Sequence, residues 1–497
     1  MLLTIDIGTS TFKSALWDYK GKRLSFVSEP LSVDAHNGKY EANPSQWLSA
    51  FERCCKQLGK LDQVDAIVIS GNGPTLVPVT GDNLPIPDSL LPAPYSNARL
   101  WLDRRAEKYQ REVSEVMGGF VDACFFLPKI LFIRNDENEL YEKTKFFLGC
   151  PEYLAYALTG EARNVFPSAG FDRWFWNDSV LEKLNLDNSK FPVFIRPGDM
   201  FGFITSQTAD RFGFRKKTPV ISGGPDFFAA ILGAGVTYPG QVCDRGGSSE
   251  GINLCTHRDI FDETKKHNES AQTQMRSFLM SYAHPVKPYW NLSGVINTSG
   301  KAIDWACGLL GVNSFDDFIS LAKKSEAGSG GLVFIPDLAG ERVSGKVSDG
   351  FSKNQCVSDS NGNASWSGIS LLTGRSEAAN SVLEGIGYAI KNVLHVMEDS
   401  GAKAAQLRVT GGLAGCSCLN QIKADITGLE VLEGVYSEAE LLGLAIIGSC
   451  VMGKFSSCAE ASKELCKVKK RYEPNPKNAE LYNRLFYIYK KNIFHRE

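Results

Sequence analysis

Three short glycine-rich turns could hold phosphate groups: Gly8-Thr9-Ser10, Gly246-Gly247-Ser248 and Gly411-Gly412, with Leu413 beside the last. Each turn follows a segment with the pattern of a β-strand. Such turns leave backbone N–H groups unpaired around a space that no Cβ atom fills, and these concavities bind anions. One such turn is most often an ordinary hairpin connection, but three of them predict a site in which two turns hold a polyphosphate and the third lies under a nucleoside.

Two charged residues flank the first turn. Asp6 ends the preceding strand, where its carboxylate is placed to hold Mg²⁺ or a metal-bound water against the phosphates. Lys13 adds a positive charge, although a solvated strand lysine explains its position equally well. No Gly-Lys pair is followed by Ser or Thr and no G-x-G-x-x-G motif begins a helix, which argues against P-loop NTPases and dehydrogenases.

Asp226 is the strongest single candidate for catalysis. It follows Gly223-Gly224-Pro225 at the end of an expected strand, and small residues continue from it to Gly235. The local sequence favours an ordinary helix N-cap, which stabilises a helix by about 1 kcal/mol. Its place between the two halves of the chain instead suits a general base that accepts a hydroxyl proton near the transferred phosphoryl group, with Phe227 beside it at the substrate.

A second candidate is the segment Trp101-Leu102-Asp103-Arg104-Arg105. Trp101 offers an apolar face to C–H groups, while Asp103 and Arg105 offer an acceptor and donors to hydroxyl groups, which is the combination that a polyol needs. A charged helix start capped by Asp103 explains the same residues equally well.

The elements that must position these residues follow strand and helix periodicities. Residues 2–6, 12–17 and 23–27 predict an antiparallel meander. Asn43 as N-cap and Pro44 at the first helical position predict a helix with one apolar face. The apolar run 64–69 predicts a buried parallel strand that ends in a loop.

The order of strand, glycine turn and strand recurs downstream. Asp6-x-Gly8-Thr9-Ser10 aligns with Asp244-x-Gly246-Gly247-Ser248 at an offset of 238 residues, and a helix at about 375–397 precedes a strand at 406–409. This internal duplication predicts two like α/β domains. We place them at 1–235 and 236–497, with a charged helical end at about 450–497.

Composition excludes several classes of protein. The 497 residues carry 54 Lys and Arg against 56 Asp and Glu, which disfavours nucleic acid and anionic membranes as partners. No run of eighteen apolar residues and no signal peptide is present, so a cytoplasmic protein is expected. The 13 cysteines include no CxxC pair and are expected to be reduced thiols. The sequence is compatible with a homodimer.

These residues together resemble the FGGY family of carbohydrate kinases along nearly the whole chain. The similar segments are Ile5–Ser10 with Lys13, Trp101–Arg105, Pro128-Lys129 with Phe132 in place of the usual Trp, Glu152–Gly160, Gly224-Pro225-Asp226, Gly340-Glu341-Arg342, Ala364–Ile369 with Ser381–Gly385, Gly411-Gly412 with Gln421 and Asp425, and Glu438–Ala445. The resemblance implies a duplicated, actin-like (RNase H-like) α/β fold. It also implies that ATP and Mg²⁺ are clamped between the lobes and that Asp226 is the base toward a sugar hydroxyl.

Three departures from the family pattern matter. Gly247 stands where Thr is usual, and Leu413 stands where a third Gly is common. Gly73, Pro74 and Thr75, expected at the substrate, belong to a segment that replaces the Q-M-H-G of typical xylulose kinases. The resemblance therefore implies phosphorylation of a sugar or polyol, with xylulose as first candidate. Glycerol, gluconate or another polyol remains an alternative substrate, and a non-catalytic sugar-binding relative an alternative to a kinase.

Overall fold

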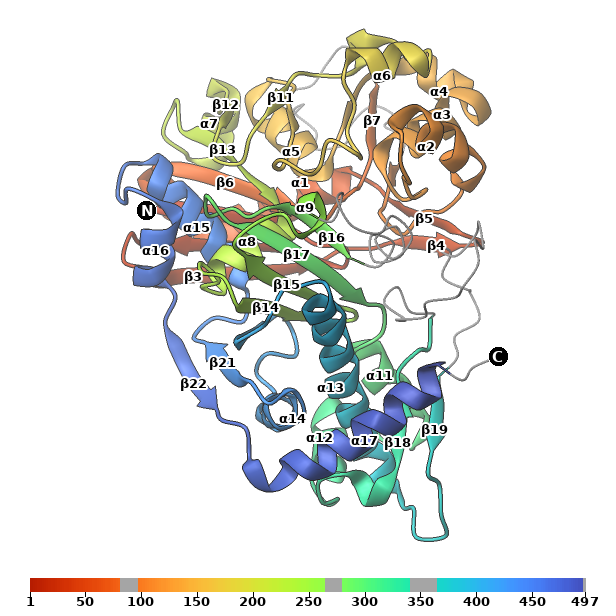
Figure 1. Ribbon diagram of the computed structural model, residues 1–497. Coiled ribbons are helices and arrows are strands. Elements are labelled where there is room, and N and C mark those ends of the chain that lie inside the picture. Colours follow the sequence, from red (N-terminus) through yellow and green to blue (C-terminus); the bar gives the residue numbers. More distant parts are fainter. Residues whose placement is uncertain (81–96, 264–278, 340–363, 495–497) are drawn as a thin grey trace. The chain divides into compact units, whose positions relative to one another are not determined.

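A computed structural model describes residues 1–80, 97–263, 279–339 and 364–494, so the expected Gly340-Glu341-Arg342 motif lies outside the described residues. The chain forms two compact units (Figure 1). Unit 1 contains Met1–Gly233 and Glu440–Leu465, and unit 2 contains Ala234–Ala439 and Cys466–Glu497. The division expected from the sequence differs in that it assigned residues 440–465 to the second domain.

Unit 1 is built on a six-stranded sheet in the order β12-β13-β6-β1-β2-β3. The meander expected at the start of the chain is confirmed, because β1 pairs antiparallel with β2 and β2 with β3, while β6 lies parallel to β1. The bounds are β1 (Leu2–Ile7), β2 (Thr11–Trp17), β3 (Arg23–Pro30), β6 (Ala66–Gly71), β12 (Met200–Phe203) and β13 (Pro219–Pro225).

Helices and short strands complete unit 1. The helix expected after Asn43 is α1 (Ser45–Leu58), and the Asn43 side chain accepts a hydrogen bond from the Ser45 N–H at 2.9 Å. The other elements are β4 (Asp34–His36), β5 (Lys39–Ala42), β7 (Val77–Thr80), β8 (Ala98–Arg99), α2 (Gln110–Met117), α3 (Phe126–Asp136), α4 (Asn138–Lys143), β9 (Thr144–Leu148), α5 (Cys150–Thr159), β10 (Asn164–Val165), α6 (Asp178–Lys183), β11 (Phe194–Ile195), α7 (Ser206–Phe212), α8 (Asp226–Gly233) and α16 (Cys458–Leu465).

Unit 2 is built on a seven-stranded sheet in the order β16-β17-β15-β14-β20-β21-β22. Its strands are β14 (Gln241–Gly246), β15 (Glu250–Thr256), β16 (Met280–Ala283), β17 (Trp290–Ile296), β20 (Gln406–Thr410), β21 (Glu430–Gly434) and β22 (Val468–Tyr472). The other elements are α9 (Ile260–Glu263), α11 (Gly300–Leu309), α12 (Phe315–Ala322), β18 (Val333–Ile335), β19 (Ser365–Ser367), α13 (Arg375–Asp399), α14 (Ser417–Thr427) and α17 (Pro476–Phe494).

The pairing of the strands confirms the internal duplication. In unit 1, β1 pairs antiparallel with β2 and parallel with β6, and β6 pairs parallel with β13. In unit 2, β14 pairs antiparallel with β15 and parallel with β20, and β20 pairs parallel with β21. Asp6 and Asp244 consequently occupy equivalent strands, each before a glycine turn.

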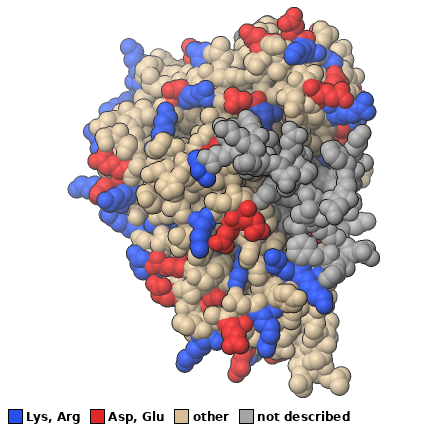
Figure 2. Space-filling model, viewed as in Figure 1, with Lys and Arg blue, Asp and Glu red and all other residues tan. Residues whose placement is uncertain are grey.

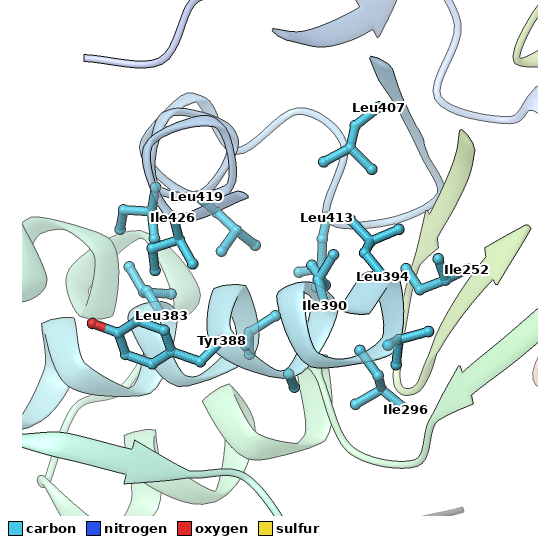
Figure 3. Close-up of a cluster of buried hydrophobic side chains, with 14 of the residues drawn as sticks. Ile252, Ile296, Leu383, Tyr388, Ile390, Leu394, Leu407, Leu413, Leu419 and Ile426 are labelled. Atoms are coloured by element: carbon cyan, nitrogen blue, oxygen red, sulfur yellow. The ribbon is translucent and has the colours of Figure 1, made fainter. Parts of the chain in front are cut away.

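The core of unit 2 lies around the long helix α13. Figure 3 shows Leu383, Ile390 and Leu394 of this helix among apolar side chains of the neighbouring elements. Leu413 belongs to the same cluster and is 8% exposed. The side chain of Leu413 is therefore part of this core.

The C-terminal part of the chain is not the uniform helical end expected from the sequence. β22 forms an edge strand antiparallel to β21, and four of its five residues are exposed. Its Lys-Lys-Arg run gives it the charged composition of a solvated helix, while the edge of a sheet accepts charged side chains equally well.

Helix α15 (Ala439–Val451) begins at the boundary between the units and packs against α8 through Gly443. A Cβ atom at Gly443 would lie 1.8 Å from the carbonyl oxygen of Ala229. No side chain fits between the two backbones, and this contact is one reason why residues 440–465 belong to unit 1.

We expect Gly443→Ala to destabilise unit 1 by roughly 1–3 kcal/mol, because α15 must move away from α8 to admit the added methyl group. Thermal unfolding of the full chain measures the effect. Gly119→Ala is the matched control, since a Cβ atom at Gly119 meets nothing within 4 Å. Equal melting temperatures of the two variants would contradict the close approach of the helices.

In the described part of the chain no helix is both long enough and apolar enough to cross a membrane. On the face shown in Figure 2, basic and acidic side chains are interspersed. This distribution agrees with a formal net charge of −2.

Candidate active site

The first glycine turn connects β1 to β2 in unit 1. Its glycine is not a free donor, because the N–H of Gly8 bonds to the carbonyl oxygen of Thr11 at 2.9 Å. Within the described residues, the N–H groups of Thr9 and Ser10 bond to no backbone carbonyl. The expectation of unpaired N–H groups is therefore wrong for Gly8, and Thr9 and Ser10 provide the donors available to an anion.

Asp6 lies beneath this turn and is 3% exposed. The Ser70 hydroxyl donates to its Oδ1 at 2.9 Å. Burial, the charge of Glu440 and, more weakly, that of Asp226 raise the pKa of Asp6 to about 7, against the lowering effect of Lys13. The structure thus brings Asp6, Lys13 and Asp226 together in one charged cluster with Glu440.

Lys13 is not a solvated strand lysine. Its Nζ lies 3.4 Å from Oε1 of Glu440, and its side chain is 24% exposed. No role was expected for Glu440, although this residue lies inside the Glu438–Ala445 segment that resembles the family. Its distance of 427 residues from Lys13 explains why no local pattern reveals the pair.

The cluster fits a divalent cation that is shared with phosphate groups. Glu440 Oε2 is buried and has no hydrogen-bond partner among the described residues, and Asp6 adds a second carboxylate beside it. The described residues contain no group of three or more metal-ligating side chains. Mg²⁺ usually binds one or two carboxylates, several waters and substrate phosphates, so this donor set suits it.

The raised pKa of Asp6 predicts a pH dependence. Below pH 7 the Asp6 carboxyl of the free enzyme is mainly protonated, and a proton there competes with a bound cation. We therefore expect kcat/KM for Mg-ATP to fall about tenfold per pH unit below pH 7. Initial rates from pH 5.5 to 8.5 measure this profile, with Asp6→Asn as the control that removes the titrating group. A flat wild-type profile across this range would contradict the prediction.

Asp226 is the first residue of α8, directly after β13. Its Oδ1 accepts a hydrogen bond from the N–H of the adjacent residue, Phe227, at 2.7 Å. The expected N-cap bond, which comes from an N–H two or three residues further on, is not this one. The charge of Asp226 also acts on Asp6. Asp226 thus lies both at the start of a helix and in the charged cluster. The ring of Phe227 stacks on that of Phe171, with 6.3 Å between the ring centroids.

The Trp101 segment contacts the first turn directly. The indole N–H of Trp101 donates to Thr9 Oγ1 at 3.0 Å. Asp103 is 2% exposed and accepts hydrogen bonds from Arg105 and from the Tyr40 N–H. These bonds outweigh burial and hold the pKa of Asp103 below its usual value.

Arg105 is also engaged by a residue that the sequence did not indicate. It donates to Glu41 Oε1 at 2.6 Å, and Glu41 is paired in turn with Arg99 at 2.7 Å. The alternative of a helix capped by Asp103 is not observed, because the next helical turn begins only at Glu107. Asp103 and Arg105 instead belong to a buried ion-pair network.

Gly73, Pro74 and Thr75 form the loop after β6. Asn72 anchors this loop to the end of β1, because its backbone and side-chain N–H groups both donate to the Ile7 carbonyl oxygen, at 2.8 and 2.9 Å. The Thr75 hydroxyl donates to Asn72 Oδ1 at 2.5 Å. The structure therefore places the loop next to the first turn, with Gly73 exposed and Thr75 buried.

Unit 2 brings the other two glycine turns together. The Leu413 N–H donates to the Gly246 carbonyl oxygen at 3.2 Å. A Cβ atom at Gly411, whose φ is +85°, would lie 2.4 Å from the same oxygen. The Gly247 and Gly411 N–H groups bond to carbonyl oxygens of Ser249 and Ser437.

In these two turns, as in the first, the N–H groups that could bind an anion belong to residues after the bonded glycine. Ser248 and Gly412 have N–H groups without a backbone carbonyl partner within the described residues, and both residues are exposed. Gly247 lacks the hydroxyl group of the usual Thr, but the second turn still has a backbone N–H donor at Ser248.

A buried ion triad, formed by Asp244, Glu250 and Lys423, underlies the second turn. Lys423 Nζ donates to Asp244 Oδ2 at 2.7 Å and to Glu250 Oε1, and all three side chains are at most 2% exposed. The Ser299 hydroxyl donates to Glu250 Oε2 at 2.6 Å. Burial and Glu250 raise the pKa of Asp244, whereas Lys423 lowers that of Glu250 despite its burial. The sequence did not indicate this triad.

Comparison with known proteins gives consistent results. The model described as "FGGY family of carbohydrate kinases, N-terminal domain" matches residues 1–233, and the corresponding C-terminal domain matches residues 263–452. A xylulose kinase of Staphylococcus epidermidis is 26% identical, over 98% of this chain and 95% of the relative.

Solved structures are similar over the same extent. The ligand-bound xylulose kinase from Lactobacillus acidophilus covers 99% of this chain and 98% of its own, with a TM-score of 0.80 and 21% identity. The Plasmodium falciparum glycerol kinase with ADP covers 100% of this chain and 98% of its own, with a TM-score of 0.78 and 17% identity. At these identities the likeness shows the fold, which is the one expected from the sequence.

Proposed function

Because the chain belongs to the FGGY family of carbohydrate kinases, we propose that it transfers the γ-phosphoryl group of ATP to a hydroxyl group of a ketopentose, with xylulose as first candidate. The observation that carries this proposal is the hydrogen bond between Trp101 and Thr9. It joins a segment suited to a polyol directly to a turn suited to phosphate, as a reaction between the two substrates requires.

In this proposal Asp226 accepts the proton of the attacking hydroxyl group. In unit 1, Thr9 and Ser10 donate backbone N–H groups to phosphate oxygens. Unit 2, taken by itself, offers the same kind of donor at Ser248 and Gly412. Asp6 and Glu440 are the residues that would hold Mg²⁺, which when bound neutralises charge on the transferred phosphoryl group. Lys13 balances part of the negative charge of Glu440.

The sugar-binding role falls to unit 1. Trp101 provides an apolar wall for C–H groups, and the aromatic pair of Phe227 and Phe171 provides a second one. Asp103 and Arg105 are held rigidly by their ion-pair network, so they are ordered before the sugar arrives.

A coupled assay of ADP release with a panel of ketopentoses, polyols and aldonates tests the proposal. We expect xylulose to give the highest kcat/KM, and a substrate-independent release of ADP to be slow. Glycerol or gluconate as the best substrate would overturn the assignment of xylulose and keep the kinase. ATP hydrolysis that no carbohydrate accelerates would overturn the kinase.

A different substrate has one specific observation in its favour. The segment Asn72-Gly73-Pro74-Thr75 contains no histidine, unlike the Q-M-H-G segment of typical xylulose kinases. The side chain of Asn72 is hydrogen-bonded to the end of β1. A non-catalytic sugar-binding relative is distinguished by isothermal titration that shows sugar binding without phosphoryl transfer.

A further inference from the structure

Lys129 is a buried cation in unit 1 to which no function has been given above. It lies on α3, is 2% exposed, and donates from Nζ to three backbone carbonyl oxygens. These are the carbonyl oxygens of Pro74 at 2.8 Å, Leu100 at 2.7 Å and Arg99 at 3.4 Å. Among the described residues, Lys129 forms hydrogen bonds with carbonyl oxygens alone.

The three carbonyl groups belong to two segments: the loop after β6, which the sequence places at the substrate, and the residues that lead into the Trp101 segment, to which the proposed function gives the sugar. Pro74 lies in the loop after β6, and Leu100 directly precedes Trp101. An ammonium group has three N–H donors in a compact arrangement, so one lysine can join both segments at a single point.

The remaining bonds link both segments to the first glycine turn. Asn72 donates to the Ile7 carbonyl oxygen, and Trp101 donates to Thr9 Oγ1. A closed circuit of hydrogen bonds and short chain segments therefore runs from the turn through the 72–74 loop, across Lys129, and back through Leu100 and Trp101. Without Lys129 the two segments stay joined through the β-bridge of Leu76 with Arg99, but the direct link between Pro74 and Leu100 is lost.

We infer that Lys129 is a positioning residue for carbohydrate binding, which sets the spacing of the Pro74 loop and the Trp101 segment relative to the phosphate-binding turn. This inference rests on the proposed function. Lys129 touches neither substrate and acts through the three carbonyl groups. Burial lowers the pKa of Lys129 to about 8, which shows that a charge at this position is costly and favours a specific role over packing alone.

The variant Lys129→Met is expected to fold. It removes a buried charge, and two of the three carbonyl groups keep another donor: Arg99 accepts from the Leu76 N–H at 2.9 Å, and Leu100 accepts from the Asp103 N–H at 3.0 Å. Only Pro74 loses the single partner that the described residues show for it.

Lys190 offers a matched control within the same unit. It is also buried, at 9% exposure, and its Nζ donates to the Thr144 carbonyl oxygen at 2.6 Å. That oxygen belongs to neither sugar segment, so Lys190→Met has the same chemical change away from the circuit.

The test combines hydrogen–deuterium exchange with kinetics on xylulose. In the full chain without ligands, we expect exchange in residues 72–77 and 97–103 to become at least tenfold faster in Lys129→Met and to remain unchanged in Lys190→Met. The KM for xylulose should rise at least tenfold in Lys129→Met, with kcat changed less than threefold and the Kd of Mg-ATP unchanged. Lys129→Arg, which keeps the cation and its donors, should return KM toward the wild-type value.

The two readouts separate this inference from the proposed function. Unchanged exchange in both segments, or an equal effect of the two Met variants, would overturn the positioning role of Lys129 whatever the substrate is. A wild-type enzyme that phosphorylates no carbohydrate would instead overturn the proposed function, and the exchange experiment would still decide whether Lys129 orders the two segments.

Discussion

Asp226→Asn should lower the kcat for sugar-dependent ADP release by about 10²–10⁴-fold, the range that a positioned general base contributes. Asparagine has nearly the same shape and its side-chain oxygen can still accept the Phe227 N–H bond, so α8 should begin as before. It cannot accept the hydroxyl proton. Because only the transition state needs that proton transfer, kcat and kcat/KM should fall together while KM for the sugar stays within about threefold.

The control for this experiment is Asp210→Asn, which removes a carboxylate of unit 1 whose side chain is 68% exposed. It should leave the rate unchanged. Isothermal titration of Asp226→Asn with Mg-ATP should show the affinity retained or increased, since a negative charge near Asp6 has been removed. A turnover number close to that of the wild type would remove Asp226 from the mechanism and leave it a helix-start residue.

The second large effect is expected at the buried ion triad. Lys423→Met leaves Asp244 and Glu250 together in a site that is at most 2% exposed, without a cation. Breaking a buried ion pair by removing one partner costs about 3–5 kcal/mol. For a domain of this size we expect the melting temperature of unit 2 to fall by roughly 6–20 °C, because each kcal/mol shifts it by about 2–4 °C.

Three further variants make the prediction specific. Lys403→Met, at a lysine whose side chain is 81% exposed, should leave the melting temperature unchanged. Asp244→Asn should cost less than Glu250→Gln, because one lysine balances only one carboxylate: burial and Glu250 raise the pKa of Asp244, whereas Lys423 lowers that of Glu250. Differential scanning calorimetry measures all four variants. Equal losses for Asp244→Asn and Glu250→Gln would refute this expected difference between the two carboxylates.

The triad also links stability to nucleotide binding. Glu250 begins β15 directly after the second glycine turn, and its Oε1 would lie 3.0 Å from a Cβ atom at Gly246. A displaced Glu250 therefore displaces the turn. We expect Lys423→Met to weaken Mg-ATP binding as well as to lower the melting temperature.

Much of this arrangement was predictable from the sequence. The meander at the start of the chain, the helix after Asn43 and the parallel strand β6 follow from periodicity and turn residues, which depend on neighbours within a few positions. The duplication was visible as the spacing of 238 residues between Asp6 and Asp244. The family followed from the order of the motifs and is confirmed by the matching models.

The errors in the sequence interpretation have a common physical origin. β22 lies in the charged end at about 450–497 that was expected to be helical. A charged edge strand has the same composition as a solvated helix, and nothing local shows which sheet edge it will join. Gly8, Gly247 and Gly411 were expected to offer free N–H groups, but a tight turn closes with its own hydrogen bonds and leaves the following residues as donors. In both cases the result depends on a partner strand or carbonyl group and not on the residue itself.

The choice of distant partners is what only the folded chain decides. Lys13 meets Glu440 across 427 positions, Lys423 meets Asp244 across 179, and Lys129 meets Pro74 across 55. Residue type and local spacing establish that a lysine or carboxylate lies on a given strand or helix. Which charge it faces in a buried environment depends on how those elements pack, and burial makes these pairings energetically decisive. The chain's own pattern thus established the fold and the family and predicted the phosphate turns, whereas packing determined which charges lie beneath those turns.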